Sequence, residues 1–365
     1  MNINTSRRAM AALGSWAVGL RLIAAASMDG AQLMNSGWLS AILSCLMTIP
    51  AMLIIAMITH ADVHAKPIAL LDRALCPLMR RAFCLVLCLG SLYELPITLR
   101  MLTFSAEYSA LDHHPMMALM TTALLGCYAA CARGGAGLCG SALTWRPLYY
   151  TITAIVAIVM LQSVNPLWLM PIFGPGLGQI MRSAIAFAGM QSALITGWLC
   201  FSAESGDSQT GGAGYPLTGP LLMLRTLGRS AAISTGMTLI ICMLSPAMPG
   251  APTERDFNLE HFLANGQHVN TLQFPMMFTW FLSLAIMMGF YMYSAAALLG
   301  SVLPGIAYRW RLIIVTVAGG IMSISHAASR IHIEDVNTIR FWAVSGFMLL
   351  FAVGFWVKRR VSYNA

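Results

Sequence analysis

The sequence predicts an all-α polytopic membrane protein with about ten transmembrane helices. Of its 365 residues, 58% are hydrophobic and only 9% are charged, and the mean hydropathy is +0.73. A soluble domain carries roughly 25% charged residues, so this composition excludes one. Apolar runs of ~20 residues recur along the chain, each long enough to cross a hydrocarbon core of ~30 Å.

Polar breaks between the apolar runs define the expected spans and their orientation. The spans are approximately 6–26, 37–59, 82–104, 116–132, 144–164, 179–201, 225–247, 275–303, 309–329 and 339–357. With the N-terminus inside, most of the 21 Lys and Arg residues fall on the cytoplasmic side. The positive-inside rule therefore favours cytoplasmic termini. A cleavable signal peptide ending near Ala24–Ser27 is the alternative for the first run, but Gly14, Gly19 and Arg21 interrupt its apolar core.

The connecting segments show no second domain, so we expect one integral membrane domain over 1–365. Between the second and third spans, 67–77 carries apolar residues at helical spacing and predicts a short interfacial helix. The glycine-rich stretch 202–219 predicts a flexible cytoplasmic loop. The outer loop 248–274 is long enough for a short helix or lid.

Ten spans with both ends inside are compatible with two inverted repeats of five spans, about 6–164 and 179–357. Such repeats bind ligands between broken first and sixth helices, where glycine interrupts the apolar run. The corresponding positions are Gly19 and Gly189. Unwinding there would free backbone groups for a ligand, and the predicted contacts are Val18, Gly19, Leu20, Phe187, Ala188 and Gly189. The alternative is that both glycines serve close helix packing.

Glu94 is the one carboxylate expected deep within a span, next to Tyr93 and two residues before Pro96. An ionised carboxylate in the membrane must be paired, hydrated or protonated, so Glu94 is a candidate for ligand-amine binding or polar coupling. A structural interhelical pair is the alternative. Tyr93 is either a ligand contact or a core aromatic residue.

Three arginines, Arg21, Arg100 and Arg182, fall near the outer third of their spans. Each is either a structural anchor or part of an outer gate. As a gate residue, Arg21 would pair with Glu334 or Asp335, or with Glu94 if it lies deeper.

The remaining polar residues predict neither an enzyme nor a metal site. On span eight, Ser283 and Met287 lie one turn apart and could contact a ligand, although the Met-rich composition of this span also suits core packing. Asp112–His114 lies in an expected loop and lacks further metal ligands. We interpret His326 as a core histidine. The Cys84/Cys88 and Cys127/Cys131 pairs are interpreted as packing residues. We expect no metal or other cofactor, no catalytic residues and no nucleic-acid partner.

Several short motifs, in order along nearly the whole chain, resemble those of the endospore germination permease family. This family comprises the B-type membrane subunits of spore germinant receptors, within the amino acid–polyamine–organocation superfamily. The motifs are Gly37–Leu43, Lys66–Arg81, Leu99–Arg100, Ala132–Gly135, Pro171–Trp198 and Tyr291–Ala297. The sequence departs from the family at Val18-Gly19, Met190-Gln191 and Met287-Met288, where family members often have a Gly-x-Gly-like break, an acidic residue and a lysine.

The resemblance implies a LeuT-like helical fold that recognises a small nutrient germinant, commonly an amino acid. It also implies assembly with two other receptor subunits in the endospore inner membrane. The departures imply a more apolar site or a different ligand. An H⁺- or Na⁺-coupled amino acid permease of the same superfamily is the main alternative, and a structural receptor subunit that binds no ligand is a third.

Overall fold

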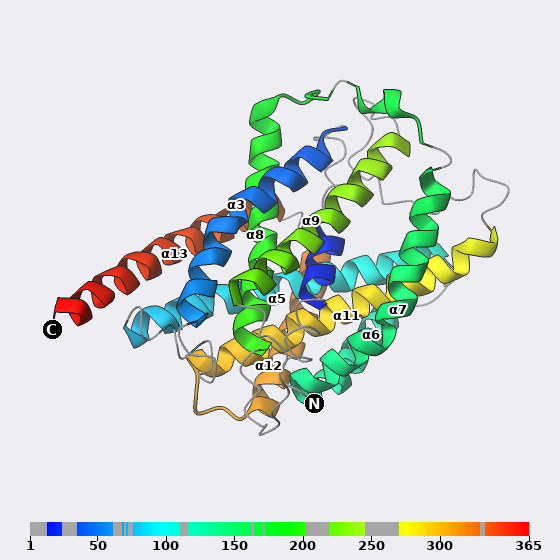
Figure 1. Ribbon diagram of the computed structural model, residues 1–365. Helices are drawn as coiled ribbons and strands as arrows, with labels where there is room; N and C mark the ends of the chain where they lie inside the picture. The colour runs from blue at the N-terminus through cyan, green and yellow to red at the C-terminus, as the bar shows by residue number, and fades with distance from the viewer. Residues whose placement is uncertain are drawn as a thin grey trace, which may run out of the picture.

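The computed structural model describes residues 13–23, 35–60, 68, 71, 76–109, 116–161, 164–170, 172–201, 219–244, 270–328 and 333–364. Within these ranges all regular secondary structure is helical, which confirms the predicted all-α class (Figure 1). The helices are a first helix Leu13–Ile23, α3 Gly37–His60, α5 Pro77–Ser109, α6 Met116–Ala132, α7 Gly134–Leu161, the 3₁₀ helix η1 Pro166–Leu169, α8 Leu177–Phe201, α9 Gly219–Leu244, α11 Asn270–Val302, α12 Tyr308–Ala328 and α13 Ile333–Asn364. Each predicted span overlaps one of these α-helices in this order, and the described parts of the first and fourth, Leu13–Ile23 and α6, are shorter apolar helices.

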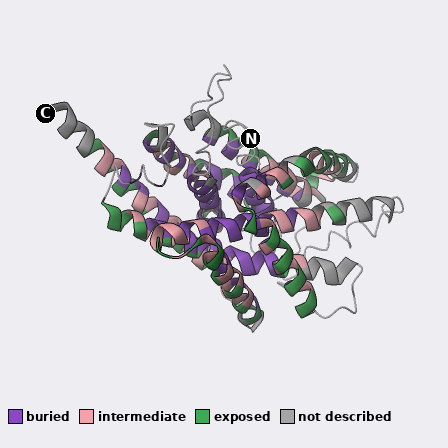
Figure 2. Cartoon of the chain, turned by 90° about the horizontal axis from the view of Figure 1, so that it is seen from below, coloured by how far each residue is buried: buried purple, intermediate pink, exposed green. Residues whose placement is uncertain are grey.

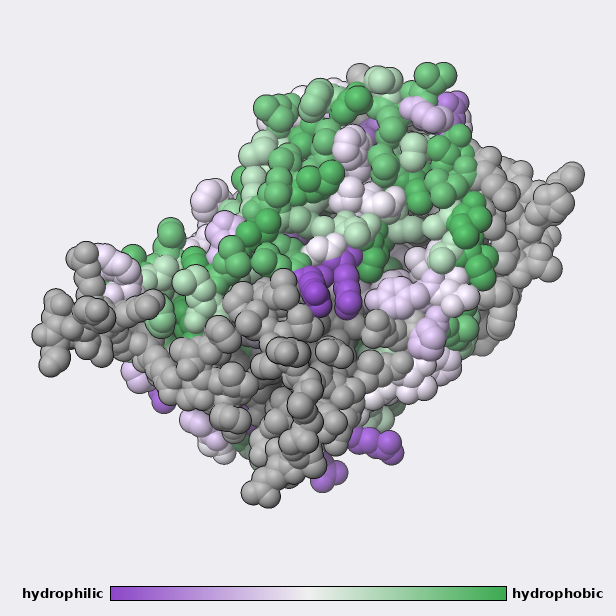
Figure 3. All heavy atoms as spheres, in the orientation of Figure 1, coloured by the Kyte–Doolittle hydropathy of each residue, from purple (hydrophilic) through white to green (hydrophobic). Residues whose placement is uncertain are grey.

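The outer faces of the helices are suited to lipid. Among the described residues, five segments are long and apolar enough to cross a membrane: Gly37–Ile58, Pro77–Leu102, Leu177–Cys200, Trp280–Val302 and Asp335–Val357. Large apolar side chains such as Leu46, Leu125 and Leu349 are exposed, and hydrophobic residues cover most of the upper part of the view in Figure 3. Buried residues concentrate where the helices meet in the middle of the bundle (Figure 2). This distribution is that of a membrane protein with a tightly packed interior.

The helix contacts repeat in the way that two inverted five-helix units predict. Helices at equivalent positions in the two halves pack together: α3 with α9, α5 with α11, and α6 with α12. The cross-contacts also occur twice. In one pair of equivalent contacts, α3 packs on α8, and Gly19 of the first helix packs against Ile233 of α9. In the other pair, α13 packs on α8, and Trp16 of the first helix packs against Tyr150 of α7. Replacing each helix by the equivalent helix of the other half converts one contact of each pair into the other contact. This relation agrees with the five-plus-five architecture.

The first helix and α8 are continuous through Gly19 and Gly189, so the interruption expected from these glycines is not present in this conformation. Both positions are instead sites of close approach. A Cβ atom at Gly189 would overlap the backbone carbonyl of Asn337 in α13, and one at Gly19 would lie 3.2 Å from Cγ2 of Ile233. Here the absence of a side chain lets neighbouring helices pack closely.

The largest boundary difference concerns α7, which begins at Gly134 rather than near residue 144. Gly134 has a φ of 75°, a conformation that glycine adopts readily and that ends α6 and starts α7 within one turn. The predicted span boundary near residue 144 left out the glycine-rich stretch 134–143, which the structure includes in α7.

Some sequence predictions lie outside the described residues. These include most of the expected interfacial helix 67–77, the loop 202–218, most of the outer loop 248–274 and the Asp112–His114 group. Among the cysteines, Cys88, Cys127 and Cys131 are buried and direct their thiols to backbone carbonyls of α11 at 3.3–3.4 Å. They therefore hold α5 and α6 against α11.

Candidate functional site

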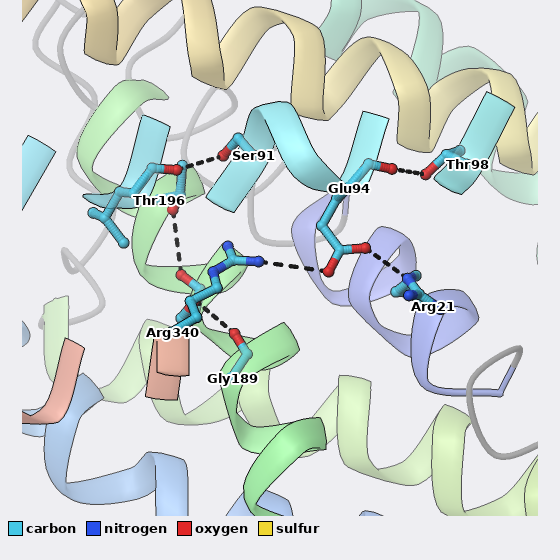
Figure 4. A network of polar contacts seen from close by, with 9 residues as sticks. Arg21, Ser91, Glu94, Thr98, Gly189, Thr196 and Arg340 are labelled. Atoms are coloured by element: carbon cyan, nitrogen blue, oxygen red, sulfur yellow. Dashed lines mark hydrogen bonds and ion pairs between the residues drawn. The ribbon is translucent and has the colours of Figure 1, made fainter. Parts of the chain in front are cut away.

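Three charged side chains meet in the interior, where the first helix, α5 and α13 come together (Figure 4). Nε of Arg21 donates a hydrogen bond of 2.6 Å to Oε2 of Glu94. On the other side, Nη1 of Arg340 lies 3.6 Å from Oε1 of Glu94. The exposed fractions are 0% for Arg21 and Glu94 and 4% for Arg340. We refer to these three residues as the charged cluster.

The local structure of α5 places Glu94 toward both arginines. Thr98, one turn further along α5, donates from Oγ1 to the carbonyl oxygen of Glu94 at 2.8 Å, and Ser91 bonds back to the carbonyl of Leu87 at 3.0 Å. Such back-bonding satisfies hydroxyl groups inside the helix without a partner on another element. The polar side chains of α5 near Pro96 are therefore accommodated locally, while the Glu94 carboxylate is left to pair across helices.

A glycine on α5 makes room for the Arg340 side chain. Gly90 lies one turn before Glu94, and a Cβ atom there would be 2.5 Å from Nε and 2.8 Å from Cζ of Arg340. The guanidinium group therefore reaches Glu94 along the glycine surface of α5. A larger residue at position 90 would displace it.

The cluster has more positive than negative charge. Among the described residues that are buried, Arg21 and Arg340 are the cations and Glu94 is the carboxylate, which leaves one positive charge in excess. Within the described part of the chain, Nη1 and Nη2 of Arg21 and all three guanidinium nitrogens of Arg340 have no hydrogen-bond acceptor. Arg340 is thus held by charge and packing alone. Chemically, this arrangement can bind an anionic group.

Tyr291 of α11 lies beside the cluster, and further polar side chains of α11 and α8 are buried in the bundle. Tyr291 lies near enough for electrostatic interaction with Glu94 and both arginines, and its hydroxyl has no hydrogen-bond partner among the described residues. Ser294, three residues further on the same helix, likewise has a buried hydroxyl without one. On α8, Gln191 donates from Nε2 to Ser44 and Cys45 at 2.9 Å each. The Gln191 amide thus connects α8 to α3.

The predicted site residues are divided between the cluster and the surrounding core. Arg21 and Glu94 come together, which is the deeper of the pairings expected for Arg21, and Tyr93 is half-buried beside Glu94. Ser283 and Met287 lie on α11 at four-residue spacing before Tyr291, so they share a helix face with it. The other predicted contacts are buried core residues: Val18, Leu20, Phe187 and Ala188.

The other two predicted arginines lie at the surface. Arg182 of α8 is 60% exposed and forms an ion pair of 3.3 Å with Asp335 of α13. Asp335, one of the expected partners of Arg21, is thus paired with Arg182. An exposed pair of this kind stabilises a protein by about 0–1 kcal/mol. Arg100 is exposed on α5.

Arg340 is a site residue that the sequence analysis did not select; it lies at the edge of the last predicted span, 339–357. The position of Arg340 on the helix could have indicated that its side chain faces the interior. Arg340 is spaced at helical intervals with the buried residues Asn337, Val344, Met348 and Phe351 of α13. A charged residue on the buried stripe of a membrane helix requires a partner, so this register indicates an inward position.

The comparisons with known proteins agree with this architecture. The chain is similar to the solved structure of Mhp1, a nucleobase-cation-symport-1 family transporter in a closed conformation with bromovinylhydantoin bound, at 12% identity and a TM-score of 0.62, covering 97% of this chain and 79% of Mhp1. It is also similar to a manganese transporter of Eremococcus coleocola, at 12% identity and a TM-score of 0.58, covering 94% of this chain and 76% of the transporter. At these identities the similarity establishes the fold. No curated protein matches the chain.

Half of the sequence carries a specific family signature. A family model described as spore germination protein matches residues 6–196, which include the first helix, α3, α5 and most of α8. Two of the three cluster residues lie within this region. Together with the transporter fold, the match identifies a permease-like, multi-pass membrane protein, and the chain belongs to the spore germination protein family.

Proposed function

We propose that this protein is the membrane subunit of a spore germinant receptor, binds a small nutrient germinant and signals through partner subunits. The observation that carries the proposal is the family match over residues 6–196, combined with a buried charged cluster in the interior of a transporter fold. The germinant is an amino acid or a related small molecule. It binds among the first helix, α5, α8 and α11, with both termini of the chain in the cytoplasm and the protein in the endospore inner membrane.

The cluster offers a route from binding to signalling. Arg340 belongs to α13, which contacts α8 through the Asn337 backbone at Gly189 and through the ion pair of Asp335 with Arg182. A ligand that draws Arg340 away from Glu94 changes the packing of α13 on α8. Such a change shifts a helix equilibrium only to the extent that the ligand prefers one arrangement. Partner subunits that contact α13 would read this shift.

A secondary transporter of the same fold is the second candidate. It is favoured by the similarity to Mhp1 and to the manganese transporter, both of which move solutes. The same site would serve either function. The two candidates differ in their partners, because a transporter works without signalling subunits.

The test is purification of the tagged protein from spore membranes at its natural expression level, followed by mass spectrometry. The proposal predicts two further membrane-associated proteins in amounts comparable to this chain. An unrelated tagged spore membrane protein, purified in parallel, controls for non-specific recovery. Recovery of this chain alone, stable and monodisperse, together with substrate uptake in liposomes, would contradict the receptor proposal and establish the transporter.

A further inference from the structure

The unbalanced charge of the cluster indicates which ligand group it recognises. We propose that the ligand is a small monocarboxylate anion, bound through its carboxylate by Arg340, and that a ligand amine is not required. This inference rests on the proposed function only in assuming that the site binds a small molecule. It applies equally to a sensor and to a transporter.

Arg340, rather than Arg21, is the residue free to bind the ligand. Arg21 already donates a hydrogen bond of 2.6 Å to Glu94, whereas the nearest approach of Arg340 to Glu94 is 3.6 Å, beyond hydrogen-bonding distance. All three nitrogens of the Arg340 guanidinium are buried and lack an acceptor within the described residues. A buried, incompletely paired guanidinium is unfavourable, and an incoming anion would relieve this.

A carboxylate matches these donors in shape and charge. The planar guanidinium presents parallel N–H groups that bind the two oxygens of a carboxylate together. The Tyr291 hydroxyl, which is buried near the cluster and has no hydrogen-bond partner in the described structure, supplies an additional donor. One bound monoanion would also balance the charge of Arg21, Glu94 and Arg340.

The same balance argues against an essential ligand amine. Glu94 is the one buried carboxylate among the described residues, and two arginines already face it. A ligand ammonium group placed there would add a third cation to a site that holds an excess positive charge. Recognition of the carboxylate alone is therefore favoured over recognition of a zwitterion.

The first experiment measures binding to the purified full-length protein in lipid nanodiscs in a chloride-free buffer. The probes are straight-chain carboxylates of two to six carbons and benzoate, each compared with its primary amide, and propionate compared with L-alanine. At least one carboxylate should bind saturably, about 10- to 100-fold more tightly than its amide, because the amide lacks the charge-assisted hydrogen bonds. Propionate should bind at least as tightly as L-alanine. Amides that bind as well as the acids, the absence of binding by every carboxylate, or binding of L-alanine without propionate would overturn the proposal.

Variants locate the binding group. Arg340→Gln leaves Arg21 and Glu94 as a balanced pair, so the protein should fold and lose carboxylate binding. Gly90→Ala keeps the charge but displaces the Arg340 guanidinium, so it should weaken binding without unfolding α5. Arg309→Gln removes an exposed arginine at the start of α12 and is the matched control, with binding unchanged. Wild-type affinity in folded Arg340→Gln would overturn the assignment, and wild-type affinity in Gly90→Ala would do so if Arg340→Gln does not fold.

The outcomes separate this inference from the proposed function. Carboxylate binding by a protein that purifies without partners would retain the inference and overturn the receptor proposal. Partner subunits together with no carboxylate binding would overturn the inference and retain the receptor.

Discussion

Glu94→Gln is expected to destabilise the protein more than any other single substitution within the charged cluster. The change preserves the size of the side chain but removes the one buried carboxylate of the described residues, and two buried arginines then face each other without a counter-charge. Removing one partner of a buried ion pair typically lowers the free energy of unfolding by about 3–5 kcal/mol. The variant should unfold at a markedly lower temperature in nanodiscs.

The matched variant for this prediction is Arg340→Gln, which alters the same cluster but leaves one arginine paired with one carboxylate. Its thermal midpoint should remain close to that of the wild type. Thermal unfolding of both variants is followed by tryptophan fluorescence in the same lipid. The measurement compares the loss of thermal stability in Glu94→Gln with that in Arg340→Gln. Equal losses of stability in the two variants would show that the cluster carries no excess positive charge.

Gly189→Ala is expected to produce the second large effect. The added Cβ atom would overlap the Asn337 carbonyl, and backbone atoms of α13 cannot move aside as a flexible side chain can. Overpacking of a tightly packed interior lowers the free energy of unfolding by about 1–3 kcal/mol, and contact with a backbone places this substitution at the upper end. The protein level in membranes and its thermal midpoint should both fall.

Gly178→Ala provides the control on the same helix, because an added Cβ atom there meets no other heavy atom within 4 Å in the described structure. Alanine also has a higher helix propensity than glycine, so this variant should be as stable as the wild type. Both variants are compared by their amounts in membranes and by thermal unfolding. If Gly189→Ala were as stable as Gly178→Ala, α8 and α13 would not pack through this glycine.

The helices were predictable because hydropathy is a strong signal in membranes. Each apolar run of the sequence overlaps one helix of the described structure, since a chain inside lipid has to satisfy its backbone hydrogen bonds within the segment. The ends were harder to predict. The start of α7 at Gly134 depends on a positive φ at this glycine, and the glycine-rich stretch that follows has a low helix propensity that gave no sign of a helix.

The site was predictable where a charge interrupts an apolar run. Arg21 and Glu94 were selected for this reason, and the structure pairs them. Arg340 lies where the last apolar run begins, so hydropathy gives it the same appearance as an arginine at the membrane surface. Its inward position depends on the rotation of α13, which packing against α8 and α5 determines.

The glycines show a different limit of sequence reasoning. A glycine in an apolar helix suits both a break and a close contact, and the sequence does not separate the two. At Gly189 the close approach of the Asn337 backbone of α13 identifies the glycine as a packing contact, and Asn337 is far away in the sequence. Tertiary contacts of this kind become visible only when the helices are assembled.

The most direct test of the account is the germination of spores that carry Arg340→Gln in the chromosomal gene. Spores with Arg309→Gln and spores that lack the gene are compared with it, after the amount of each variant in the spore membrane has been matched by immunoblotting. Germination is followed as the loss of optical density after nutrient addition. We predict that Arg340→Gln spores respond as the deletion does, while Arg309→Gln spores respond as the wild type. A normal nutrient response of Arg340→Gln spores, in a background where deletion abolishes it, would contradict the assignment of the charged cluster as the ligand site.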